Sequence, residues 1–191
     1  MSPMATIAKR IKELDPDAKT VFIGPCTAKK AEFQLPEVHR YVDCVLTFEE
    51  LQAMFDSREL DITSMEESEL NDASGFGRIF AHCGGLAAAA AEALREQGSD
   101  FDLKPLSCDG IEECRAALLK ASRGKLDANF VEGMACMGGC VNGAGNMVHS
   151  DANRVKVDSF SKKAHTQNIK DSLNIAMTEF DSAVSGGGEG Q

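Results

Sequence analysis

Short runs of β-prone residues alternate with helical patterns along the first 150 residues, and this alternation most constrains the fold. Strands are expected at residues 20–23, 41–46, 103–107 and 128–131. Helices are expected at residues 5–14, 48–57, 86–97 and 111–122. Thr47 and Glu50 form a capping box before the second of these helices. Strands separated by helices of this length predict an α/β fold, a parallel sheet flanked by helices, with residues 1–150 as one lobe.

The remainder of the chain is expected to add little to this lobe. Residues 151–183 are predicted to form a loop and then a helix, at about residues 164–180, that packs on the lobe. The tail of residues 184–191 is rich in glycine and is expected to be disordered.

The net charge of −10 argues against partners with anionic surfaces. We therefore expect no nucleic acid and no membrane as a partner. No apolar run approaches the roughly 20 residues that cross a bilayer. The first residues lack the apolar core of a signal peptide, so a cytoplasmic protein is expected.

Two cysteines four residues apart give the strongest chemical signal, in the run MACMGGC at residues 134–140. Cys136 and Cys140 can converge on one metal site, because the glycines between them let the backbone turn tightly. Soft thiolates favour iron–sulfur clusters or zinc, and the chain has no second pair at zinc spacing. Two buried cysteines in a glycine-rich turn are the alternative.

A second signal is the run GPCTAKK at residues 24–30, where Cys26 follows a predicted strand. The cations of Lys29 and Lys30 would lower the thiol pKa and favour metal binding. Taken alone, this run also fits a basic surface turn with a buried cysteine. Sites in parallel sheets form beyond the carboxyl ends of strands, which is where both runs fall.

In this order, the two runs resemble the signatures of the C-terminal catalytic domain in the large chain of iron-only (FeFe) hydrogenases. One signature, Pro-Cys-x-x-Lys-Lys-x-Glu, is matched at residues 25–32, and the other, Glu-x-Met-Ala-Cys-x-Gly-Gly-Cys-x-x-Gly, at residues 132–143. Residues 42–51, and Phe80 followed by Gly84 and Gly85, resemble further family segments. The resemblance covers about residues 2–146.

The resemblance implies an H-cluster, which is a 4Fe–4S cubane joined by one cysteine to a two-iron subcluster. By position it implies cubane ligands at Cys26, Cys136 and Cys140, with Cys140 as the bridge. It also implies that Lys29 donates a hydrogen bond to an iron-bound cyanide, and that Met134 and Phe80 line the pocket. The implied reaction is the reversible reduction of protons to dihydrogen.

The match also departs from the family. The family's Cys-Cys-Pro signature, which would supply the fourth ligand, is missing, so we expect a fragment that is inactive alone, with the clusters absent or incomplete. Expected partners are the remainder of the catalytic domain, an electron carrier such as ferredoxin, and regulatory domains. Cys83 is an alternative fourth ligand, whereas Cys44 is expected in the core, on one strand face with Val42 and Leu46.

Two further departures leave other functions open. Gly24 replaces a usual methionine, and the run NGAGNM at residues 142–147 replaces a Gly-Gly-Gly-Gln-Pro-like ending. Both resemble the sensory branch of the family. The alternatives are therefore a hydrogen- or redox-sensing iron–sulfur module, or a relative that holds only a cubane for assembly or electron transfer.

Overall fold

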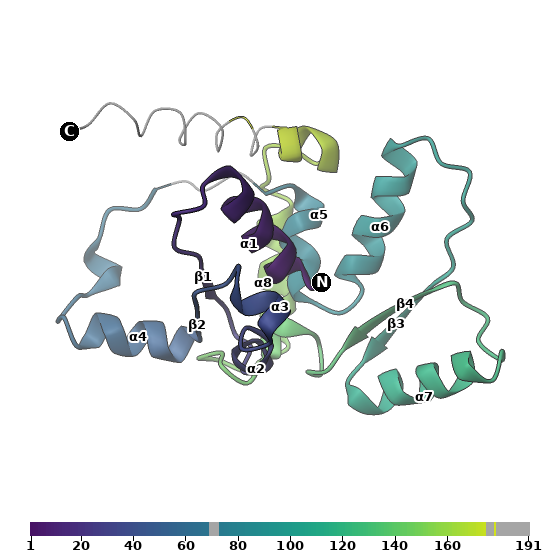
Figure 1. Ribbon diagram of the computed structural model, residues 1–191, viewed down its shortest axis with the longest axis horizontal. Coiled ribbons are helices and arrows are strands. Elements are labelled where there is room, and N and C mark those ends of the chain that lie inside the picture. The colour runs from purple at the N-terminus through teal and green to yellow at the C-terminus, as the bar shows by residue number, and fades with distance from the viewer. Residues whose placement is uncertain (69–72, 175–177, 179–191) are drawn as a thin grey trace. The chain divides into compact units, whose positions relative to one another are not determined.

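The computed structural model describes residues 1–68, 73–174 and 178, and these residues form two compact units. The first unit contains residues 1–68 and 143–148, and the second contains 73–142, 149–174 and 178. Both combine helices with a parallel pair of strands (Figure 1). The predicted parallel α/β fold is confirmed, with two separate pairs of strands. The lobe of residues 1–150 stays a prediction, and the tail of residues 184–191 lies outside the described residues.

The first unit is built on two three-residue strands that pair in parallel, with Val21 opposite Cys44 and Ile23 opposite Leu46. The capping box predicted before the helix at residues 48–57 is present. The Thr47 side chain accepts from Glu50 N, and the Glu50 side chain accepts from Thr47 N, at the start of α4 (Phe48–Asp56). The elements of this unit are α1 (Pro3–Leu14), β1 (Val21–Ile23), α2 (Ala28–Glu32), α3 (Pro36–His39), β2 (Cys44–Leu46), α4 (Phe48–Asp56) and η1 (Ile62–Ser64).

The core of the first unit lies between α1 and the strands. Met4, Ala5 and Ala8 fall on one face of α1 and are buried. They belong to one cluster with Val42 and Val45. The small alanine side chains let the helix approach the strands closely.

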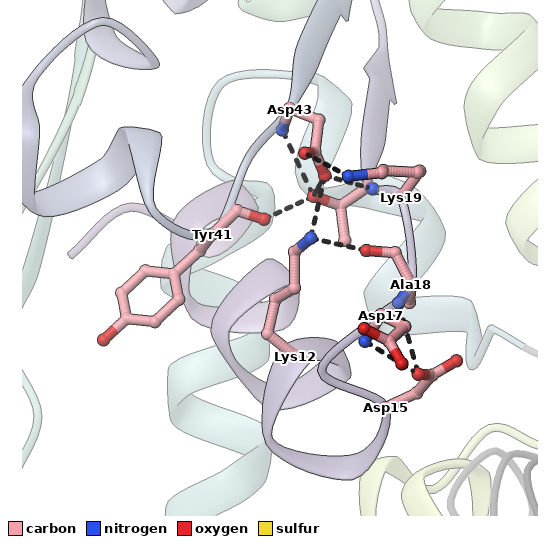
Figure 2. Close-up of polar contacts among 8 residues, drawn as sticks. Lys12, Asp15, Asp17, Ala18, Lys19, Tyr41 and Asp43 are labelled. Carbon is pink, nitrogen blue, oxygen red and sulfur yellow. Dashed lines mark hydrogen bonds and ion pairs between the residues drawn. The ribbon is translucent and has the colours of Figure 1, made fainter.

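A polar cluster closes one end of this unit around the carboxylate of Asp43 (Figure 2). Asp43 Oδ2 accepts hydrogen bonds from Thr20 N at 2.8 Å and Thr20 Oγ1 at 3.2 Å. Lys12 Nζ lies 3.0 Å from the same oxygen. The hydrogen bond from the Thr20 backbone, followed by the one from the Lys12 side chain, lowers the pKa of Asp43 to about 2.

We expect Asp43→Asn to lower the free energy of unfolding at pH 7 by about 1 kcal/mol, since the carboxylate is partly exposed to solvent. The folded pKa lies below the ordinary value of 3.8, so the charged form stabilises the fold above about pH 4. This contribution is lost as the pH falls from 3.8 towards 2. Urea unfolding at pH 7 and at about pH 2 measures the difference. Asp17→Asn is the control, and an equal loss at both pH values would contradict the assignment.

The second unit is built on β3 (Pro105–Asp109) and β4 (Phe130–Met134), which pair in parallel with Ser107 opposite Glu132. Figure 1 shows α6 (Gly85–Glu96) and α7 (Ile111–Ser122) on opposite sides of this pair. Successive residues of β4 face these two helices in turn. The Glu132 side chain reaches the start of α6, whereas an added Cβ at Gly133 would lie 3.0 Å from Cys114 Sγ in α7.

The remaining elements of the second unit are α5 (Gly75–Arg78), η2 (Ile79–Ala81), η3 (Cys140–Asn142) and α8 (Ala152–Ser161). Of these, α5 and η2 contact α6, and α8 contacts α5, η2 and η3. The sequence pattern predicted a loop where α8 lies and a helix at residues 164–180. Residues 169–174 are helical, and residues 175–177, 179 and 180 lie outside the described part.

Tertiary contacts explain why α8 is helical. His82 Nε2 lies 2.9 Å from Asp158 Oδ1, and Arg78 Nη1 donates to Phe160 O at 3.0 Å. The Arg78 guanidinium also stacks over the Phe160 ring, 4.0 Å from its centroid.

Within the described residues, no helix is both long and apolar enough to cross a membrane.

Candidate functional site

The loop that carries Cys136 and Cys140 begins directly after β4 and ends in η3. Gly139 N donates to Cys136 O at 3.0 Å, which closes a tight turn. Gly138 and Gly139 have φ values of +80° and +96°, a region that residues with a side chain rarely adopt. Cys136 is half-buried and Cys140 is exposed. The glycines predicted to shape this loop are therefore required by its backbone.

The turn of residues 82–87 packs against the cysteine loop. Cys83 N donates to Gly138 O at 3.2 Å. A Cβ added at Gly139 would lie 2.6 Å from Cys83 N and 2.7 Å from His82 Cα. From the other side, Gly138 N donates to Asp109 Oδ1 at 2.6 Å. The cysteine loop is thus seated between β3 and the His82–Cys83 backbone.

A buried carboxylate fixes this supporting turn in place. Glu132 is 1% exposed and accepts hydrogen bonds from backbone N–H groups at the start of α6. Its Oε2 also accepts from Ser107 Oγ at 3.1 Å. In the sequence, Glu132 was singled out only as part of a motif. Glu132 directly follows the strand predicted at residues 128–131, and a charge next to an apolar strand was the signal that could have identified it.

Cys83 lies next to the cysteine loop, but its electrostatic surroundings disfavour metal binding. Burial, followed by the carboxylates of Asp109 and Glu132, raises the pKa of the Cys83 thiol. A raised pKa disfavours the thiolate that binds a metal. The role of Cys83 as an alternative fourth ligand stays a prediction.

In the first unit, Cys26 follows β1 in a turn that other backbone segments hold in place. Gly24 N donates to Leu46 O at 3.0 Å, and Gly145 N donates to Pro25 O at 3.1 Å. Residues 143–148, which follow the Cys140 loop in the chain, therefore pack against the turn that carries Cys26. The Phe22 ring lies 2.9 Å from where a Cβ at Gly24 would be. This ring fills the space that a methionine at position 24 would need.

The two lysines after Cys26 have different contacts. Lys29 Nζ pairs with Glu32 Oε2, and both side chains are largely buried. Burial opposes ionisation of Glu32, but hydrogen bonds from Lys29 and Ser2 outweigh it and lower the pKa of Glu32. Lys30 Nζ donates to Val45 O at 2.9 Å and lies 2.7 Å from Glu50 Oε2. Lys30 thus connects β2 to α4, whereas Lys29 stays beside Cys26 in the chain.

The predicted site residues divide between the two units. Cys26 and Lys29 belong to the first unit, and Phe80, Met134, Cys136 and Cys140 belong to the second. Met134 is the last residue of β4 and is half-buried, whereas Phe80, in η2, is 36% exposed. Among the described residues, no three His, Cys, Asp or Glu side chains form a group that could hold a metal ion. The predicted roles of these residues stay predictions.

The donor set nevertheless fits an iron–sulfur cluster. All seven cysteines lie within the described residues, and none is in a disulfide. The Cys136–Cys140 loop offers two soft sulfur ligands on a glycine-rich turn. Cys26 offers a third sulfur from the end of a strand.

An apolar cavity of about 490 Å³ lies elsewhere, between α1 and β1 of the first unit. Ile7, Ile11, Val21 and Phe22 are among its lining residues. None of the predicted site residues lines this cavity, so it does not bear on the chemistry of the cysteines.

A family model described as the iron-only hydrogenase large subunit, C-terminal domain, matches residues 1–144. Iron hydrogenase 1 of Clostridium pasteurianum is 26% identical to this chain over 213 residues, which cover 89% of the chain and 37% of the relative. The periplasmic [Fe] hydrogenase large subunit of Nitratidesulfovibrio vulgaris is 31% identical over 175 residues, covering 74% of the chain and 42% of the relative.

A relative of different described function is also similar. The cytosolic Fe-S cluster assembly factor narfl of Xenopus tropicalis is 26% identical over 198 residues, covering 83% of the chain and 40% of the relative. The chain thus spans about two fifths of the length of these curated relatives. Among solved structures, an [FeFe]-hydrogenase of Chlamydomonas reinhardtii superposes with a TM-score of 0.64 at 18% identity, over 92% of this chain and 63% of that chain.

Proposed function

Because this chain belongs to the family of C-terminal domains of the iron-only hydrogenase large subunit, we propose that Cys26, Cys136 and Cys140 ligate an iron–sulfur cluster of the hydrogenase type. The observation that carries the proposal is the Cys136–Cys140 loop. Its two thiols lie on a turn whose backbone strongly favours glycine, and the Asp109 carboxylate and the Cys83 backbone hold that turn from two sides. Such support is expected for a loop that orients metal ligands.

Each remaining site residue has a role in this proposal. Cys140 would be a ligand of the H-cluster shared by its two parts, and Met134 and Phe80 would line the pocket around it. Lys29 has three N–H donors, so it can keep its contact with Glu32 and still donate to an anionic iron ligand. When bound, the complete cluster supplies the chemistry for reversible reduction of protons to dihydrogen.

Three thiolates leave one of four cubane positions to another ligand, so we expect the chain to be inactive alone. We propose that the remainder of the catalytic domain supplies this ligand and that a ferredoxin-like carrier supplies electrons. Regulatory domains are a further proposed partner. We also propose a cytoplasmic location for the protein.

The test is an infrared spectrum of the full-length protein, purified without oxygen from cells that mature iron-only hydrogenases. Carbonyl and cyanide bands, together with hydrogen evolution, are the expected result. Iron and sulfide analysis on the same sample reports the cubane. A protein with iron and sulfide but without these bands would contradict the hydrogenase proposal.

A second candidate is a cubane-only protein for cluster assembly or electron transfer, which the similarity to the cytosolic assembly factor favours. It predicts a cubane Mössbauer signature without carbonyl bands. A sensing role is the third candidate, favoured by the Phe22 ring beside Gly24. It predicts carbonyl bands with very slow hydrogen turnover, and Gly24→Met with Phe22→Ala is then expected to raise turnover.

A further inference from the structure

We propose that Glu132 is a positioning residue that holds the Cys136–Cys140 loop in shape through the turn of residues 82–87. That this loop binds a cluster rests on the proposed function. That Glu132 holds the loop in shape is a claim about the metal-free chain. Three features carry it: the burial of Glu132, its four donors and the contacts of the turn with the loop.

The surroundings of Glu132 are unusual for a buried carboxylate. The side chain is 1% exposed, and its oxygens accept from Gly84 N, Leu86 N, Ala87 N and Ser107 Oγ at 3.0 to 3.4 Å. All four donors are neutral. Burying a charge is costly unless hydrogen bonds satisfy it, and these four contacts together offset that cost.

Three of these contacts replace a missing helix cap. The residue before α6 is Gly84, which has φ of +91° and no side chain to accept from the first N–H groups. Glu132 reaches across from β4 and accepts from the second and third residues of the helix, Leu86 and Ala87. The helix N-terminus also favours a negative charge at this point. Glu132 therefore fixes where the chain enters α6.

The residues just before α6 also contact the cysteine loop. Cys83, which precedes Gly84, donates its N–H to Gly138 O at 3.2 Å. The backbone of His82 and Cys83 leaves no room for a side chain at Gly139. A displacement of this turn must therefore move Gly138 and Gly139, which lie between the two proposed ligands.

The experiment compares Glu132→Gln with Glu96→Gln in the full, metal-free chain. Glu96 is a matched control, because it also accepts two backbone N–H groups, from Ile169 at 2.7 Å and Lys170 at 2.9 Å, at the other end of α6. Glutamine keeps the shape of Glu132 but turns an amide NH₂ towards groups that are themselves donors. Peptide-resolved hydrogen exchange reports the turn and the loop.

For Glu132→Gln we expect exchange at residues 82–87 and 136–142 to rise about tenfold, while exchange in α7 is unchanged. Glu96→Gln should raise exchange only near residues 169–170. Exchange in residues 1–68, in the first unit, is the internal reference. A uniform rise across the chain, as global destabilisation gives, or no rise at residues 136–142, would overturn the proposal.

Two further measurements keep the result interpretable. If Glu132→Gln does not fold, Ser107→Ala removes one of the four contacts and should give a smaller rise, about threefold, at the same segments. Absence of that local rise in a folded Ser107→Ala chain also counts against the proposal. Iron content is measured separately, so a wild-type chain that takes up no iron argues against the proposed function and leaves the exchange result unaffected.

Discussion

Replacing Cys140 by alanine should reduce the iron content of the anaerobically reconstituted full-length protein by more than about tenfold, because losing a direct ligand costs more than losing one of its outer supports. Cys140 is exposed at the end of the glycine turn, so removing its thiol leaves no cavity in the core. The loss of iron would thus reflect ligation, with little change in stability. Cys136→Ala should have the same effect, and iron and sulfide analysis measures both.

Cys114→Ala is the control for these variants. The Cys114 thiol is half-buried beside β3 and β4, 3.9 Å from Cys108 O and 3.7 Å from Met134 O. It therefore lies close to the strand that leads to the cysteine loop, but it is no proposed ligand. Iron content should stay at the wild-type value. Loss of iron in Cys114→Ala, or retention of iron in Cys140→Ala, would show that the ligands are misassigned.

Local signals in the sequence predicted much of the fold. The helix expected at residues 111–122 is α7 with the same bounds, and the capping box of Thr47 and Glu50 is formed as expected. Both depend on neighbours within a few residues. The alternation of strands and helices likewise predicted parallel pairing, because short helical crossovers favour it.

Features fixed by distant residues were not predicted. Cys44 was expected to share a buried face with Val42, but Val45 is buried and Cys44 is half-buried. The N–H groups of Asp43 and Cys44 both donate to Thr20 O, so the strand loses its simple alternation at this point. The backbone N–H groups that donate to Glu132 lie 45 to 48 positions away in the chain.

Gly139→Ala should lower the free energy of unfolding of the metal-free chain by about 3 kcal/mol or more, from two causes that act at the same residue. The backbone of Gly139 has φ of +96°, which a residue with a Cβ adopts only with strain. The new Cβ would also lie 2.6 Å from Cys83 N and 2.8 Å from His82 C, and these backbone atoms cannot move aside cheaply. The structure can relieve the overlap only by separating the cysteine loop from the turn behind it.

Gly98→Ala separates the two causes, because Gly98 also has a positive φ, +65°, but a Cβ there meets nothing within 4 Å. It should cost only about 1 kcal/mol, the strain of the left-handed conformation. Urea unfolding of both variants gives the difference that is due to overlap with the His82–Cys83 backbone. Equal midpoints for the two variants would mean that the loop and the turn are not packed together. A large excess for Gly139→Ala, with loss of iron after reconstitution, would tie the close packing of the turn to the capacity of the loop to hold metal.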